Sequence, residues 1–172
     1  MGDLIGKSVK RVEDNRFLKG EGKYTDDFNM AHQTYAVYVR SPHAHANIKS
    51  VDISAAEAMD GVVKVFTGQD IADAGIVGSI CGWQVDFKNG DTMKEPPHPI
   101  MVVDKVRHVG DPVAMVIAED KYTAKDAAEL VHVDYEVLNA VVNPKAAAQD
   151  GAVQVHDDVP NNIIFEWELG DK

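Results

Sequence analysis

The sequence of 172 residues predicts an α+β protein, in which helices and strands are mixed along the chain. Alternating apolar and polar segments in the first half indicate strands. An uninterrupted apolar run at Pro112–Ala118 indicates a strand that is buried on both faces. A stripe of alanines between this run and another alternating segment indicates a helix. The strand, helix and strand in the second half predict a mixed sheet with a β-α-β crossover.

In the first half, successive side chains of residues 34–40 face opposite sides, as in a strand. Pro42 ends this strand because it keeps the preceding residue, Ser41, out of the helical region. A second strand is expected at Ala46–Ile53. Its apolar residues switch from even-numbered to odd-numbered positions, so they would face opposite sides of a regular strand. This switch predicts a bulge near Lys49-Ser50.

A short helix is expected next, because Ser54-Ala55-Ala56-Glu57 has the pattern of a capping box. We expect this helix to end at Asp60-Gly61, with the glycine in the left-handed region. The β-branched segment Val62–Phe66 predicts a third strand. Thr67, with Asp70 three residues later, is expected to cap one more helical turn.

Residues 75–100 lack any periodicity, because glycines and prolines interrupt every pattern. Irregular segments of this length are uncommon inside compact domains. We interpret this one as an insertion without chemistry of its own.

In the second half, Thr123 is expected to cap a helix, with Asp126 at the third position. Small apolar side chains in this helix recur at helical spacing, at Ala124, Ala127, Ala128 and Val131. The alternating segment Val131–Val137 predicts a strand. A weaker helix is expected at Pro144–Gln149, before a last apolar stretch at Ile163–Trp167.

Composition excludes several classes of protein. Hydrophobic residues make up 45% and charged residues 26% of the chain, which is typical of a folded domain. The net charge of −11 does not suit a partner such as nucleic acid or an anionic membrane. No apolar run has the roughly 20 residues of a membrane span, and the first residues do not resemble a signal peptide.

A single cysteine, Cys81, excludes an internal disulfide and indicates a reducing, cytoplasmic location. It cannot by itself hold an iron–sulfur cluster or a structural zinc ion. As a nucleophile it would need an activating histidine, which the sequence does not place.

Two glycine motifs resemble phosphate-binding loops only in part. Gly6-Lys7-Ser8 has the end of such a motif, but its first glycine would fall at Met1 with no strand before it. Gly20-Glu21-Gly22 lacks both a third glycine and a following helix. We interpret the second motif as a turn.

Two histidines in His43-Ala44-His45 could share a metal ion on an extended segment. No further ligand cluster lies nearby in sequence, so we favour hydrogen-bonding or interface histidines. The carboxylate pairs Asp26-Asp27 and Asp157-Asp158 are expected to be solvated or to form turns. The apolar residues Trp83, Phe87, Met93 and Met101 are either a contact surface or, as we favour, a small cluster beneath the long loop. We assign no catalytic, cofactor-binding or metal-binding residue.

Four segments, in this order, resemble the large subunits of molybdenum hydroxylases, the family of xanthine dehydrogenase and aldehyde oxidase. They are Gly6–Asp27, Arg40–Val62, Asp104–Ala114 and Asp126–Glu136. The end of the chain, Ile164–Lys172, is most similar to the large chain of aerobic carbon monoxide dehydrogenase. His108 and Asp111 depart from the residues that are common in the family at their positions.

The resemblance implies the N-terminal α/β hammerhead domain of such a subunit, covering 1–172 as a single domain, with a boundary near residue 170. It implies that the intact enzyme uses molybdopterin cytosine dinucleotide, with 2Fe–2S clusters and FAD on partner subunits. None of these cofactors is expected on this chain, because the family motifs that hold them lie in later domains. Its partners would be the molybdopterin-binding domains of the same subunit and the iron–sulfur and FAD subunits.

Under this resemblance, the motif residues are interpreted as scaffold. Gly20, Gly22 and Gly110 suit turns. Arg11 or Arg40 is expected to pair with Asp14 or Asp27. The histidines of His43-Ala44-His45 and the loop around Trp83 are candidates for the surface that contacts other domains.

Two other interpretations stay open from sequence. The chain could be a free-standing binding or assembly module that has kept the fold without the enzyme. It could also be a small independent enzyme that uses Cys81 or the histidine pair. The substrate of an intact enzyme, whether carbon monoxide, an aldehyde or an N-heterocycle, is likewise open.

Overall fold

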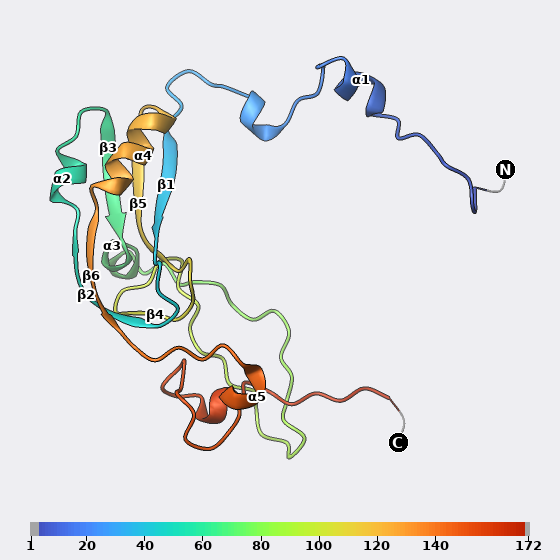
Figure 1. Ribbon diagram of the computed structural model, residues 1–172, viewed down its shortest axis with the longest axis vertical. Helices are drawn as coiled ribbons and strands as arrows, with labels where there is room; N and C mark the ends of the chain where they lie inside the picture. Colours follow the sequence, from blue (N-terminus) through green and yellow to red (C-terminus); the bar gives the residue numbers. More distant parts are fainter. Residues whose placement is uncertain (1–3, 171–172) are drawn as a thin grey trace. The chain divides into compact units, whose positions relative to one another are not determined.

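A computed structural model describes residues 4–170 of the chain (Figure 1). The chain divides into two compact units, Met1–Gln33 and Thr34–Lys172, which we describe separately. No helix in the described residues is both long and apolar enough to cross a membrane.

The first unit consists of two short helices joined by turns. The helix α1 spans Asp14–Leu18 and the 3-10 helix η1 spans Thr25–Asp27. Gly20 follows α1 with φ of 72°, which confirms the predicted turn. Gly22 is needed for a different reason, because a Cβ there would lie 2.7 Å from the Phe17 ring.

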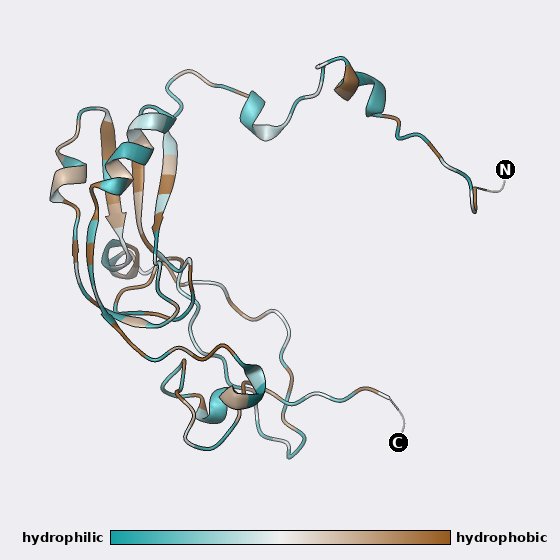
Figure 2. Cartoon of the chain, viewed as in Figure 1, coloured by the Kyte–Doolittle hydropathy of each residue, from teal (hydrophilic) through white to brown (hydrophobic). Residues whose placement is uncertain are grey.

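In the second unit, three antiparallel strands form the first sheet in the order β1-β5-β3. These strands are β1 (Tyr35–Arg40), β5 (Pro112–Ala118) and β3 (Val62–Thr67). The central strand β5 pairs with both neighbours, and Val113, Ala114, Val116 and Ala118 are buried on it. Figure 2 shows hydrophobic residues concentrated on this sheet.

The second sheet has the order β4-β2-β6 and is also antiparallel. Its strands are β4 (Lys105–Val106), β2 (Ala46–Asp52) and β6 (His132–Val137). The register of β2 against β6 shifts between Ile48 and Ser50, which confirms the predicted bulge. The α+β class is confirmed.

The expected mixed sheet with a β-α-β crossover is wrong. The helix α4 (Lys121–Glu129) does connect β5 to β6, but β6 pairs antiparallel with β2 in the other sheet. The apolar run of β5 does not come from parallel pairing. It reflects a central position between β1 and β3, with α4 packed on β1 and β5.

Side-chain caps begin the helices at partly different residues from those predicted. Thr67 and Asp70 form the predicted reciprocal cap of α3 (Gly68–Asp73). In α2 (Ser54–Glu57), the carboxylate of Asp52 accepts from the backbone N–H and hydroxyl of Ser54, instead of the predicted capping box. The predicted end of this helix at Asp60-Gly61 comes too late, although Gly61 has φ of 85°.

The cap of α4 is Asp120 rather than Thr123, because its side chain accepts from the backbone N–H groups of Tyr122 and Thr123 at 2.8 and 3.0 Å. The C-terminal elements are short, namely α5 (Pro144–Ala147) and the 3-10 helix η2 (Pro160–Asn162). The irregular segment at 75–100 is confirmed, with one isolated bridge between Ser79 and His98.

Small side chains make the core, and two clusters share it. One cluster includes Val65 and Val116, and the other includes Val106 and Val113. Partly buried Val51 and Val133 pack against both clusters and so link the two sheets.

The Asp120 cap leads to a prediction about acid stability. The Thr123 hydroxyl and backbone N–H, and then the Tyr122 N–H, lower the pKa of Asp120 from 3.8. A carboxylate with a lowered pKa in the folded state stabilises the protein above its unfolded pKa, and this contribution disappears as the pH falls through the folded value. Asp120→Asn keeps a capping oxygen that does not titrate. We expect its urea midpoint to fall less steeply than that of the wild type below about pH 4. Equal slopes would contradict the prediction.

Candidate functional site

The two rings of the histidine pair have different surroundings. His43 lies edge-on against the Tyr135 ring, with centroids 5.0 Å apart. His45 is buried, and its Nδ1 lies 2.9 Å from the carbonyl oxygen of Asn139. Nδ1 therefore carries the proton, and Nε2 of a neutral His45 is a buried acceptor without a partner in the described residues. His45 fits the hydrogen-bonding interpretation and is too buried to line a contact surface.

The phosphate-loop resemblance at Gly6-Lys7-Ser8 has no support in the local structure. Gly6 lies in a turn with φ of 76°, and the Lys7 N–H donates to the carbonyl of Leu4. The next helix begins only at Asp14, so no helix N-terminus follows the motif directly.

Carboxylates of both acidic pairs and the two arginines that were considered from sequence have hydrogen-bond or ion-pair partners. Asp27 accepts from the Tyr24 N–H at 2.8 Å, and Asp157 pairs with Lys105 at 2.9 Å. Arg11 forms the predicted pair with Asp14 at 2.9 Å. Arg40 instead donates to the carbonyl of Gly110 at 2.8 Å, which fixes the end of β1 to the turn before β5.

Cys81 is exposed, and its thiol donates to the carbonyl of Trp83 while its backbone N–H donates to Glu95. A nucleophilic cysteine must lose the proton that this hydrogen bond uses. Cys81, His43 and His45 therefore have separate partners, and the geometry does not assemble a nucleophile with its base.

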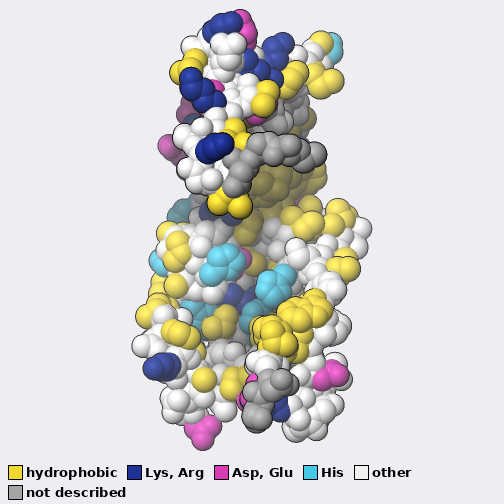
Figure 3. Space-filling view, turned by 90° about the vertical axis from the view of Figure 1, so that its right-hand side faces the viewer, with side chains coloured by type: hydrophobic (Ala, Val, Ile, Leu, Met, Phe, Trp, Pro, Cys, Tyr) yellow, Lys and Arg dark blue, Asp and Glu magenta, His cyan; other side chains and the backbone are white. Residues whose placement is uncertain are grey.

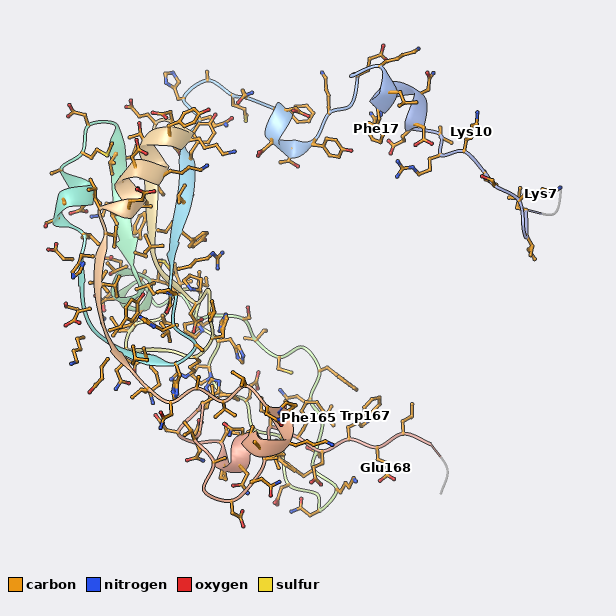
Figure 4. All side chains as sticks on the ribbon, viewed as in Figure 1. Lys7, Lys10, Phe17, Phe165, Trp167 and Glu168 are labelled. Carbon is orange, nitrogen blue, oxygen red and sulfur yellow. The ribbon has the colours of Figure 1, made fainter. Side chains whose placement is uncertain are left out.

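The long loop and the C-terminal segment together form an apolar surface. Trp83 and Trp167 meet edge-on, with centroids 5.6 Å apart, and both are more than half exposed. The Lys94 N–H donates to the carbonyl of Ile164 at 2.9 Å, and Lys88 pairs with Glu168 at 3.3 Å. Figure 4 shows Phe165, Trp167 and Glu168 along the C-terminal segment. We call Ile80, Trp83, Phe165 and Trp167 the aromatic surface.

The predicted apolar cluster beneath the loop is only partly correct. Met101 is buried, and Met93 accepts from the Val85 N–H through its sulfur. Phe87 is half-buried, whereas Trp83 belongs to the aromatic surface. A recess of about 250 Å³ lies beside Cys81, Met93 and Phe165.

Sequence reasoning missed a second recess, of about 410 Å³, which we call the histidine pocket. Its lining comes from Ser79, from the neighbouring segments 97–102 and 107–112, and from His156, and it includes His98, Arg107, His108 and Asp111. Figure 3 shows histidine side chains gathered around a hollow in which a basic side chain is visible. No local spacing in the sequence connects His156 with His98 and Arg107.

The described residues offer no ligand set for a metal ion or for an iron–sulfur cluster. Among them, no group of three or more His, Cys, Asp or Glu side chains is placed to hold a metal ion. A 2Fe–2S cluster needs four ligands, mostly thiolates, and the chain has one cysteine.

Comparison with known proteins gives a consistent family. Residues 19–139 match the family described as aldehyde oxidase and xanthine dehydrogenase, a/b hammerhead domain. The chain is 36% identical over 180 residues to the carbon monoxide dehydrogenase large chain of Afipia carboxidovorans, covering 98% of this chain and 21% of that protein. It is also 36% identical to a xanthine dehydrogenase molybdenum-binding subunit of Escherichia coli, covering 86% of this chain and 19% of the relative.

A crystal structure of the Cu,Mo-CO dehydrogenase in its carbon monoxide reduced state superimposes with a TM-score of 0.72. The identity is 36%, with 93% of this chain and 19% of that chain covered. The chain thus spans about a fifth of the length of these relatives. With a family match over most of its length, the chain belongs to the aldehyde oxidase and xanthine dehydrogenase family, as its α/β hammerhead domain.

Proposed function

We propose that this chain is the structural N-terminal domain of the molybdenum-containing large subunit of a carbon-monoxide-dehydrogenase-like oxidoreductase. In this proposal, 1–172 acts as one domain and holds no cofactor or catalytic residue of its own. The intact cytoplasmic enzyme would oxidise its substrate at molybdopterin cytosine dinucleotide carried by other domains. The 2Fe–2S clusters and FAD would reside on partner subunits. The chain alone is expected to be inactive.

The apolar side chains of residues 4–33 carry this proposal. No described residue of this unit is buried, although it has eight exposed large apolar side chains. These are Leu4, Ile5, Val9, Val12, Leu18, Tyr24, Phe28 and Met30. A segment with no core of its own needs another surface to cover so much apolar area, and a neighbouring domain of the large subunit would supply one. The aromatic surface supplies a second exposed apolar region on the other unit.

A co-purification experiment tests the proposal. The tagged chain would be expressed together with the carbon monoxide dehydrogenase large chain of Afipia carboxidovorans from which the matching fifth has been removed. We expect the two to purify as a complex. Val12→Asp, at a side chain that is 98% exposed, should weaken recovery by about tenfold, because it introduces a charge into the apolar contact.

The control is Tyr122→Asp, which changes an equally prominent exposed side chain on α4 and should leave recovery unchanged. If the chain purifies as a monomer and does not bind the truncated large chain, the result would favour a free-standing module instead. Stoichiometric molybdenum in the purified chain alone would contradict the assignment of all cofactors to other domains.

A further inference from the structure

The histidine pocket contains an arginine that forms no ion pair among the described residues, although its charge, after the hydrogen bond and charge of Lys105, also acts on Asp157 and lowers the pKa of that carboxyl. Arg107 is half-buried and lines the pocket, and its Nη1 donates to the carbonyl of Lys105 at 3.1 Å. Its Nε is buried without an acceptor in the described part of the chain, and no ion pair involves its guanidinium there. Buried donors are almost always paired, so an arginine in this state indicates a missing acceptor.

Two histidines add donors to the same pocket. His98 and His156 have ring centroids 5.9 Å apart. Nδ1 of His98 lies 3.0 Å from the carbonyl oxygen of Pro96. Because a carbonyl oxygen only accepts, Nδ1 carries a proton and donates this hydrogen bond. Nε2 of His98 then becomes a second donor whenever the ring is protonated.

Other charged groups around the pocket are already engaged. The carboxylate of Asp111 accepts from the backbone N–H groups of Arg107 and His108 and lies 3.2 Å from Nδ1 of His108. Asp157 pairs with Lys105. Asp157 and Asp158 directly follow His156 in the chain, and both favour its protonated form.

The electrostatics favour an anion over a cation. Burial, followed by the nearby charges of Arg107 and His98, lowers the pKa of His156, while Asp158 and Asp157 act in the opposite direction. The positive charges of Arg107 and His98 therefore disfavour a positive charge on His156. A cation would meet the fixed charge of Arg107, whereas an anion would offset it.

We propose that the histidine pocket binds an oxyanion, a phosphate or a carboxylate, through Arg107 and the rings of His98 and His156. Arginine and protonated histidine are the usual partners of both groups, through charge-assisted hydrogen bonds. The apolar part of a bound molecule would lie against Ile100 and Pro112, which also line the pocket. The inference stands whether or not the proposed function is correct.

The test is an NMR titration of the full chain with inorganic phosphate and, separately, with acetate, at constant ionic strength. At about pH 5.5, below the ordinary pKa of histidine because the pKa of His156 is lowered, we expect saturable shifts of the His98 and His156 ring signals with at least one anion. The bound anion should also raise the pKa of His156. Tighter binding of phosphate would identify a phosphate ligand, and equal or tighter binding of acetate a carboxylate.

Variants separate a specific site from general charge attraction. Arg107→Gln should weaken binding by about tenfold or more, and Arg107→Lys should restore part of it by returning the charge. Arg16→Gln is the matched control. Arg16 lies in the other unit, where it pairs with Glu13, so this substitution should leave anion binding unchanged. If Arg107→Gln does not fold, His156→Gln takes its place, with the same weakening expected.

Shifts that do not saturate with either anion would overturn the proposal. Equal binding by the wild type and a folded Arg107→Gln or His156→Gln variant would overturn it as well.

Discussion

Gly68→Ala is expected to lower the free energy of unfolding by about 3 kcal/mol, because a Cβ has no room at this position. An ideal Cβ on Gly68 would lie 2.2 Å from the carbonyl oxygen of Val102 and 2.6 Å from its carbonyl carbon. Both atoms belong to the backbone. Val102 is buried, and its N–H donates to the carbonyl of Pro112 at 2.9 Å, so this segment cannot move aside without breaking that bond.

Ordinary helix energetics predict the opposite sign. Gly68 is the first residue of α3 and has no positive φ, so alanine there would normally stabilise the protein by reducing unfolded-state entropy. Urea denaturation measures which effect is larger. Gly82→Ala is the matched control, because a Cβ on Gly82 meets nothing within 4 Å and its φ is not positive. A Gly68→Ala variant as stable as wild type would show that α3 can shift away from Val102.

The position of Gly68 illustrates what sequence could predict and what it could not. Local patterns predicted β1, β3, β5 and the Thr67 cap, because alternation and capping depend on neighbours in the chain. The close approach of Gly68 to Val102 depends on two segments more than thirty residues apart. Gly78 is a similar case, since its Cβ would lie 1.6 Å from the carbonyl of His98.

The sheet assignment failed for a related reason. An apolar run is compatible with a strand in a parallel sheet and with a central antiparallel strand beneath a helix. The sequence of Pro112–Ala118 does not distinguish these environments. The antiparallel pairing of β5 with β1 and β3, and of β6 with β2 in the other sheet, decides between them.

Of the candidate sites, sequence reasoning correctly favoured structural roles for Gly20 and the His45 ring. It missed the histidine pocket, because His98, Arg107 and His156 come from a loop, a turn and the C-terminal segment. None of the three belongs to a local sequence motif that would indicate a binding site. Their significance comes from burial and from the missing acceptor at Arg107, neither of which a linear pattern contains.

Asp111→Ala is expected to lower the free energy of unfolding by about 2 kcal/mol, because it leaves the backbone N–H groups of Arg107 and His108 without their acceptor. Asp111 is 7% exposed, and its carboxylate accepts from the Arg107 N–H at 2.6 Å and the His108 N–H at 3.3 Å. The same turn is held to the end of β1, since Ser41 exchanges backbone hydrogen bonds with Gly110 and Asp111. Loss of the carboxylate therefore loosens the point at which β5 begins.

Asp111→Asn distinguishes the hydrogen bonds from the charge. Asparagine keeps one oxygen that can accept from the Arg107 N–H, so the variant should lose only about 1 kcal/mol if that bond dominates. An Asn variant as unstable as the Ala variant would instead indicate that the negative charge, which lies 3.2 Å from the His108 ring, is what the turn requires. Urea denaturation of both variants at neutral pH makes the comparison. An Ala variant within about 0.5 kcal/mol of wild type would contradict the structural role of this carboxylate altogether.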